Sequence, residues 1–160
     1  MKVTGTWHGQ YTYGPSYGQV AGTSVPFVLS LTESWLRRFA GYVRDDASKG
    51  GMPERGRIAG SRRAATITFV KTMPIGYVMD ADGKRLDPRV ALRRDHGIEV
   101  PELPPHRIHY TGTLAHDGQS IAGSWVIRPS AIETDQGVWQ SGGGDGTWTA
   151  RRVSDLPAEV

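Results

Sequence analysis

A tripeptide of glycine, a small hydroxyl residue and tryptophan recurs in this chain and constrains its fold more than any other feature. The copies are Gly5-Thr6-Trp7, Gly123-Ser124-Trp125 and Gly146-Thr147-Trp148. Successive side chains of a β-strand point to opposite faces, so the glycine and the tryptophan of each copy share one face. A glycine beside a large ring lets a sheet bend and leaves room for the ring. The tripeptides therefore indicate a small, strongly curved β-sheet.

Alternation of apolar and polar residues extends this pattern along most of the chain. Residues 3–13 show it most clearly, because Val3, Trp7 and Tyr11 fall on one face. Turn signals such as Asp117-Gly118 separate the alternating segments. We expect eight strands, at residues 3–13, 26–32, 36–44, 57–60, 65–71, 106–114, 120–128 and 146–152. Strands joined mainly by short turns predict an all-β, antiparallel up-and-down barrel, whose closure removes exposed sheet edges.

Two segments depart from this alternation. Residues 129–145 form a polar excursion rich in glycine, and we expect a mobile hairpin loop at residues 142–146. Residues 72–105 form a longer insert, in which 88–95 fit one or two helical turns and a continuous strand is blocked by Pro74, Pro88, Pro101, Pro104 and Pro105. We therefore predict a single β-barrel domain over residues 1–153, a loop or short-helix insert at about 72–105, and a flexible tail over 154–160.

The composition excludes several classes of chemistry. The 160 residues include no cysteine, which removes disulfides and thiolate metal sites. No run of about eighteen apolar residues is present to span a membrane, and no apolar run of signal-peptide length follows Met1. The sequence thus predicts a cytoplasmic protein with no membrane partner.

The basic residues are concentrated in one stretch of the sequence. Arg55, Arg57, Arg62 and Arg63 lie close together in a chain whose formal net charge is +3. Proteins that bind single-stranded nucleic acid usually interleave aromatic residues with the basic ones, and this stretch contains none. We therefore expect a solvated rim of strand ends here and no nucleic-acid partner.

Neither a metal nor a cofactor is expected. His106 and His109 are three residues apart, which sends them to opposite faces of a strand and prevents them from sharing one ion. The glycines at 142–146 are followed by a predicted strand, whereas a phosphate-binding loop requires a helix after it. We predict no metal and no cofactor.

The aromatic residues are the main functional clue. If the apolar faces all point inward, eight rings converge on one interior: Trp7, Tyr11, Phe27, Phe39, Phe69, Tyr110, Trp125 and Trp148. An eight-stranded barrel is wide enough either to be filled by side chains or to hold one small ligand. In one alternative the rings line a pocket at a mouth covered by the 72–105 insert, and the phenols of Tyr11 and Tyr110 supply its polar groups. In the other they fill the barrel, with interleaved glycines compensating their volume.

Several short segments together resemble the avidin-type branch of the calycin superfamily of β-barrels. They are Gly5-Thr6-Trp7, residues 39–42, 110–112 and 123–128, and a closing strand near Gly146. The resemblance implies the barrel fold and a possible homo-oligomer, and it matches Tyr42 to the family's third-strand tyrosine. The asparagine and serine that hold biotin in that family have no counterpart, since Gly9-Gln10-Tyr11 stands in their place and the chain has no asparagine. Biotin is therefore not the predicted ligand.

We predict that the protein binds a small, largely apolar molecule at an aromatic-lined barrel mouth and performs no chemistry. The candidate ligand-binding residues are Trp7, Tyr11, Tyr42, Phe69, Tyr110, Trp125 and Trp148. One alternative is a protein-interaction or oligomeric scaffold barrel with a packed interior. A third is a calycin-type enzyme with an acid or base in the cavity, for which Glu33, Asp95 and His96 are the candidates.

Overall fold

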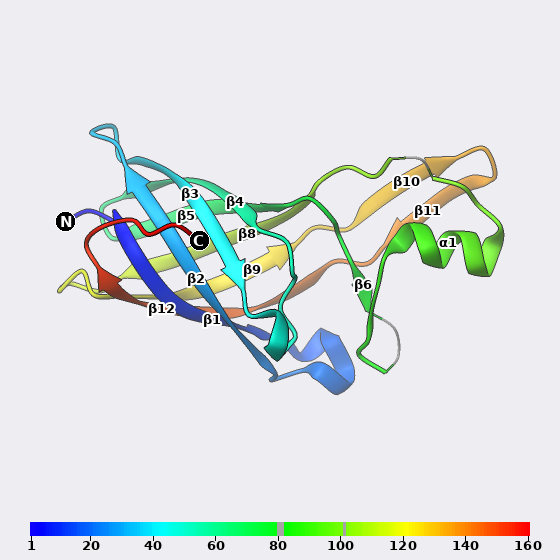
Figure 1. Ribbon diagram of the computed structural model, residues 1–160, viewed down its shortest axis with the longest axis horizontal. Coiled ribbons are helices and arrows are strands. Elements are labelled where there is room, and N and C mark those ends of the chain that lie inside the picture. Colours follow the sequence, from blue (N-terminus) through cyan, green and yellow to red (C-terminus); the bar gives the residue numbers. More distant parts are fainter. Residues whose placement is uncertain (80–81, 101) are drawn as a thin grey trace.

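A closed antiparallel β-barrel forms the centre of the computed structural model, which describes residues 1–79, 82–100 and 102–160 (Figure 1). Around the barrel the strands follow the order β1-β12-β9-β8-β5-β4-β3-β2. Their bounds are β1 Gly5–Tyr13, β2 Ser24–Glu33, β3 Arg38–Asp45, β4 Gly56–Arg63, β5 Thr66–Met73, β8 His106–Leu114, β9 Ser120–Ile127 and β12 Gly144–Ser154. Each barrel strand pairs with the next one along the chain, and β12 closes against β1. The predicted eight-stranded up-and-down barrel is therefore confirmed.

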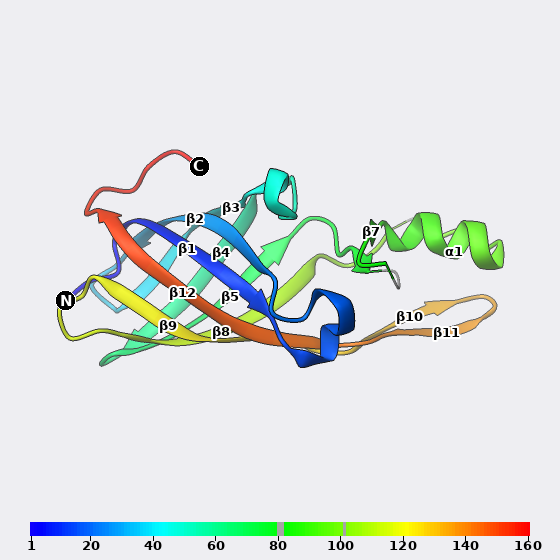
Figure 2. The same ribbon diagram turned by 90° about the horizontal axis from the view of Figure 1, so that it is seen from below.

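The two ends of the barrel are built differently (Figure 2). At one end the strands are joined by the short turns at residues 34–37, 64–65 and 115–119, and we call this the closed end. At the other end, where Tyr13, Asp45, Met73, His106 and Ile127 terminate or begin their strands, every connection is longer. We call that end the mouth.

The connections at the mouth contain the remaining secondary structure. They form the 3₁₀ helices η1 (Pro15–Val20) and η2 (Ala47–Lys49), the strand pairs β6 (Val78–Met79) with β7 (Arg85–Leu86) and β10 (Ser130–Thr134) with β11 (Gly137–Ser141), and helix α1 (Pro88–His96). The expected helical turns are thus present, in an insert of which residues 80, 81 and 101 lie outside the described residues. Among the described residues, no helix is long and apolar enough to cross a membrane.

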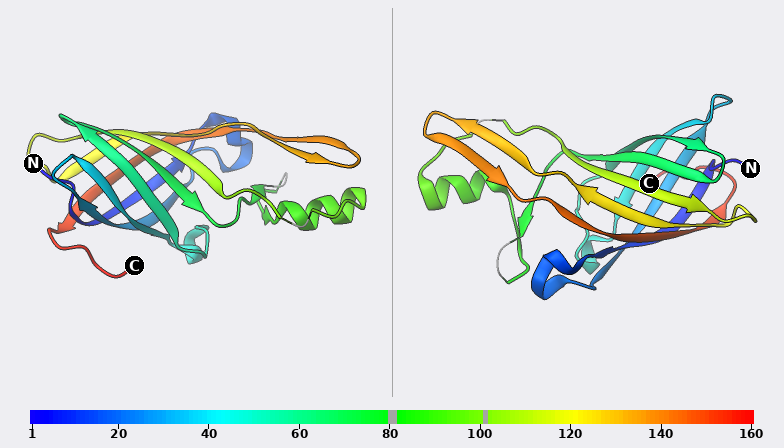
Figure 3. Two further views of the ribbon diagram at one scale, coloured as in Figure 1. Left: turned by 90° about the horizontal axis from the view of Figure 1, so that it is seen from above. Right: turned by 180° about the vertical axis from the view of Figure 1, so that it is seen from behind.

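Helix α1 and the β10–β11 hairpin extend beyond the barrel and form an arm (Figure 3). The helix begins after Asp87, whose side chain accepts a hydrogen bond from the Arg89 backbone N–H, and ends at Gly97 in the left-handed conformation. The His96 ring lies 4.1 Å from the Trp139 ring of β11. The sequence analysis expected a polar excursion over 129–145 and missed this strand pair, because only Ile132 opposite Trp139 supplies a cross-strand apolar pair.

Aromatic rings fill the middle of the barrel. The rings of Phe69 and Tyr110 stack with their centroids 4.7 Å apart. The Trp148 ring meets both in an edge-to-face arrangement, with its centroid 5.3 Å from that of Phe69 and 5.5 Å from that of Tyr110. A Cβ atom on Gly112 would lie 2.8 Å from the Trp148 ring, and one on Gly146 would lie 2.6 Å from the Trp125 ring. Gly112 and Gly146 therefore provide space that neighbouring tryptophans occupy. Of the tripeptide glycines only Gly146 does so, because the nearest atoms that a Cβ atom on Gly5 or Gly123 would meet all belong to the backbone.

Candidate functional site

A cavity of about 70 Å³ lies at the mouth, above the packed rings. Barrel strands contribute most of its wall, and the insert contributes Tyr77, Val78, Met79 and Arg85, so the insert covers the mouth. The remaining lining residues are Tyr11, Tyr13, Tyr17, Met52, Lys71, His106, Ile108, Tyr110, Trp125 and Ile127. The structure thus combines the two alternatives, because the barrel is filled at its centre and hollow at its mouth.

A buried ion pair lies at the floor of this cavity. Lys71 shares the inward face of β5 with Phe69 and Met73, and its Nζ atom lies 2.7 Å from both carboxylate oxygens of Asp45 at the end of β3. The same Nζ lies 5.1 Å from the centre of the Tyr11 ring, within range of a cation–π interaction. Burial lowers the pKa of Lys71, and the Asp45 carboxylate opposes that shift. The ion pair is therefore shielded from water but next to the cavity.

Neutral phenols surround the ion pair. Burial, followed by the nearby Asp45 carboxylate, raises the pKa of both Tyr11 and Tyr110, and burial raises that of Tyr17 to about 12. The Tyr11 hydroxyl donates a long, weak hydrogen bond of 3.5 Å to Asp45. Tyr110 is only 4% exposed, and among the described residues its hydroxyl has no hydrogen-bond partner. An unpartnered hydroxyl group thus belongs to the wall of the cavity.

His106 adds an ionisable group to the same wall. It faces the cavity, whereas His109, three residues later on β8, lies on the outer side, as the alternation predicts. Burial, together with the charge of Lys71, lowers the pKa of His106 below 6.5, so the imidazole is neutral near pH 7. Among the described residues, no three histidine, aspartate or glutamate side chains gather to hold a metal ion.

The predicted ligand-binding residues fall into three groups. Tyr11, Tyr110 and Trp125 line the cavity. Phe69 and Trp148 lie beneath it in the packed centre of the barrel, where they contact Tyr110. The last two lie elsewhere: Trp7 at the closed end, and Tyr42 on the outer surface with 42% of its area exposed.

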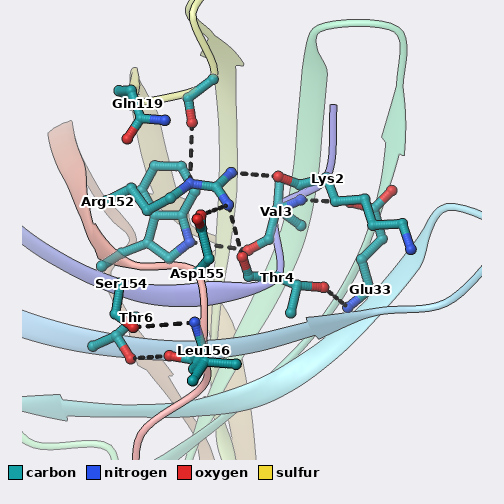
Figure 4. Close-up of polar contacts among 12 residues, drawn as sticks. Lys2, Val3, Thr4, Thr6, Glu33, Gln119, Arg152, Ser154, Asp155 and Leu156 are labelled. Carbon is teal, nitrogen blue, oxygen red and sulfur yellow. Dashed lines mark hydrogen bonds and ion pairs between the residues drawn. The ribbon is translucent and has the colours of Figure 1, made fainter.

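A polar network that includes Val3, Glu33 and Arg152 seals the closed end (Figure 4), and Trp7 belongs to it. Its Nε1 donates to the Val3 carbonyl at 2.9 Å, and the Arg152 guanidinium lies 4.6 Å from the centre of its ring. The Val3 N–H donates to Glu33 at 2.6 Å, and Glu33 also forms a 2.8 Å ion pair with Arg62. Arg152 further donates to the backbone carbonyls of Lys2 and Thr4. This network closes the barrel, and Trp7 does not contact the cavity.

None of the three acid or base candidates lines the cavity. Glu33 is held at the closed end by Arg62. Asp95 and His96 are exposed on α1, where Asp95 pairs with Arg94 and His96 packs against Trp139. Apart from the tyrosines, the ionisable side chains that line the cavity are Lys71, His106 and Arg85.

The sequence analysis did not identify Lys71, Asp45 or His106 as site residues. A usable signal was present for the first two, because each occupies an inward position of a strand that is otherwise apolar: Lys71 between Phe69 and Met73, and Asp45 two residues after Val43. Charged residues at such positions indicate a buried pair. The positions of Tyr77 and Arg85 could not be predicted in this way, because the insert is irregular and shows no alternation of apolar and polar residues.

Comparison with protein families, curated proteins and solved structures finds no match to this chain.

Proposed function

We propose that the protein binds a small, largely apolar molecule at the mouth, with the Tyr110 hydroxyl as a hydrogen-bonding group and without chemistry. The Tyr110 hydroxyl is the main support, because Tyr110 lines the cavity and its hydroxyl has no partner among the described residues. A ligand atom that accepts the phenol proton would give this hydroxyl a partner, and a hydrogen bond of this kind contributes about 0.5–1.5 kcal/mol. The aromatic walls at Tyr11, Tyr13 and Trp125 suit an apolar body.

The size of the cavity sets a condition on this function. About 70 Å³ holds roughly two water molecules, at about 30 Å³ each. A larger guest therefore displaces the covering insert. Hydrogen bonds between the insert and the loop before β4 include one from the Tyr77 hydroxyl to Glu54 at 2.7 Å and one from Arg85 to the Gly51 carbonyl at 2.7 Å. Local opening of such a segment is compatible with an insert that acts as a lid.

Binding of small aromatic compounds tests the proposal. Phenol, indole and benzoate, each screened by thermal shift, should include at least one compound that raises the melting temperature of the wild-type protein, and native mass spectrometry should show one bound copy. Tyr110→Phe should weaken that shift, whereas Tyr42→Phe, which alters a phenol on the outer surface, should leave it unchanged. If no compound of a wider library binds, or if Tyr110→Phe binds as well as wild type, the proposal fails.

An oligomeric scaffold remains the alternative function, and light scattering that reports only a monomer would count against it. The resemblance to avidin-type calycins is compatible with the closed eight-stranded barrel, and membership of that family stays a prediction. Cytoplasmic location also stays a prediction from the sequence.

A further inference from the structure

The outer surface of β3, β4, β5, β8 and β9 carries cations and no exposed acidic side chain. All residues of these strands are described, and their one acidic residue, Asp45, is buried beside Lys71. The exposed cations on these strands are Arg38, Arg44, Arg57, Arg63 and Arg107. A surface of one sign over five neighbouring strands attracts polyanions.

Two of these arginines, Arg57 and Arg107, belong to a continuous row of side chains that crosses the sheet on the side nearer the mouth. Tyr42 of β3 lies opposite Arg57 of β4, Arg57 opposite Thr72 of β5, and Thr72 opposite Arg107 of β8. The guanidinium of Arg55 lies 4.1 Å from the centre of the Tyr42 ring. Because neighbouring strands are about 4.8 Å apart, the row from Tyr42 to Arg107 spans about 14 Å. We call these five residues the arginine row.

A groove of about 820 Å³ lies at the Tyr42 end of the arginine row. Its floor is the outer face of β2, β3 and β4, and residues 157–160 form one wall, with Arg55 donating to the Val160 carbonyl at 3.3 Å. Tyr42, Arg55, Arg57 and Thr72 all line it. An aromatic ring, guanidinium groups and a hydroxyl thus line one open groove on the outside of the barrel, and the opposite wall contributes one acidic residue, Glu159.

We propose that the arginine row binds single-stranded nucleic acid. Guanidinium groups pair with phosphate oxygens, and an exposed aromatic ring offers a surface on which a base stacks whatever its sequence. The expectation from the sequence was the opposite, because no aromatic residue stands among Arg55, Arg57, Arg62 and Arg63. The fold supplies that ring from another strand, and it directs Arg62 away to Glu33. This inference is independent of the ligand proposed for the mouth.

A lipid surface fits the same face less well. Peripheral membrane binding combines cations with a group of exposed apolar side chains. On these five strands the large exposed hydrophobic residues are Tyr42 and Val126, on β3 and β9, which three other strands separate. Binding to anionic vesicles is therefore an outcome that would overturn the proposal.

Fluorescence anisotropy with a labelled oligothymidylate of about 12 nucleotides tests the proposal on the full chain. The wild-type protein should bind at about 50 mM salt and lose affinity steeply towards 200 mM. Arg57→Ala and Arg107→Ala should each weaken binding and reduce the magnitude of the salt slope by about 0.7. Tyr42→Ala should weaken binding about fivefold or more, whereas Tyr42→Phe, which keeps the ring, should bind like wild type.

Arg151→Ala is the matched control, because it removes the same charge from an exposed position on β12, outside the five strands. It should change the affinity much less than Arg57→Ala, and thermal melting should show that every variant is folded. No binding by the wild-type protein at 50 mM salt would overturn the proposal. Equal losses of affinity in Arg57→Ala and Arg151→Ala would also overturn it. A third contrary result would be binding to heparin or anionic vesicles that is as tight as binding to the oligonucleotide and is unchanged in Tyr42→Ala.

Discussion

The two ends of the barrel each bury an ion pair beside an aromatic ring, but they differ in how completely their polar groups are paired. At the closed end, Glu33 accepts from Arg62 and from the Val3 N–H, and the Trp7 indole donates to a backbone carbonyl. At the mouth, Lys71 and Asp45 satisfy each other, while the Tyr110 hydroxyl at the cavity wall has no partner among the described residues. Full pairing is what closure requires. An unpaired hydroxyl next to a cavity is what the proposed binding at the mouth uses.

The largest effect should come from breaking the ion pair at the mouth. Asp45→Asn leaves Lys71 buried without a counter-charge and should lower the free energy of unfolding by about 3–5 kcal/mol near pH 7. Burial holds the pKa of Lys71 below its unfolded value of 10.5, so the folded state binds fewer protons than the unfolded state between those two pKa values. Stability of the variant should therefore rise as the pH approaches 10.5, which urea unfolding measures.

A double variant provides the control for this prediction. Asp45→Asn with Lys71→Met removes both charges, and it should regain most of the lost stability because no unpaired charge remains. A loss below about 1 kcal/mol in Asp45→Asn, or a loss that the double variant does not relieve, would contradict the account of this pair.

The equivalent change at the closed end should be milder and should not depend on high pH. Glu33→Gln keeps an oxygen that can accept from Val3, and it leaves Arg62, whose side chain is 10% exposed, close to water. The expected loss is about 1–3 kcal/mol. A guanidinium does not deprotonate in this range, so raising the pH should restore nothing. Recovery at alkaline pH similar to that of Asp45→Asn would show that the two ends do not differ in this way.

Removing one hydroxyl from each end sharpens the comparison. Thr4→Val deletes the oxygen that accepts the Glu33 N–H at 2.9 Å, and it should cost about 1 kcal/mol. Tyr110→Phe deletes a hydroxyl without a partner and should change the unfolding free energy by less than about 0.5 kcal/mol. Equilibrium unfolding of both variants measures the difference. A cost for Tyr110→Phe equal to that of Thr4→Val would mean that the phenol is paired in solution.

The smallest expected effect is a pH dependence from His106. Its pKa lies below 6.5 in the folded protein, so the unfolded state binds more protons between those two values. The contribution of His106 is therefore complete above pH 6.5 and is lost as the pH falls towards the folded pKa. His106→Gln should flatten this part of the stability profile, measured by thermal melting between about pH 7 and pH 5. If the pH dependence of stability were the same in His106→Gln and wild type, the imidazole would be exposed to water in the folded protein.

The sequence predicted the barrel because its physical cause is local. Alternation places Val3, Trp7 and Tyr11 on one side of a strand whatever the rest of the chain does, and the glycines at 112 and 146 leave the room that the tryptophans need. The candidate site was predicted only in part. Tyr11, Tyr110 and Trp125 follow from the inward face, but which end they face depends on strand direction and on the closing network.

Other features depend on contacts between distant residues. Trp7 was assigned to the site because its side chain points inward, although Arg152, far along the chain, covers it at the closed end. Tyr42 was predicted as a ligand-binding residue because of the family resemblance. Its outward position follows from the alternation of inward and outward residues along β3. The pairing of Lys71 with Asp45 joins two strands that are not neighbours, which no short segment reveals.

Methyl NMR tests the difference between the two ends most directly. Titration with the compound that gives the largest thermal shift should move the methyl signals of Ile108, Ile127 and Met79 at the mouth. Signals from Val3, Leu31 and Leu114, which are buried near the closed end, should stay in place. Shifts confined to the closed end or to the outer surface, with the mouth unchanged, would contradict a binding site at the mouth.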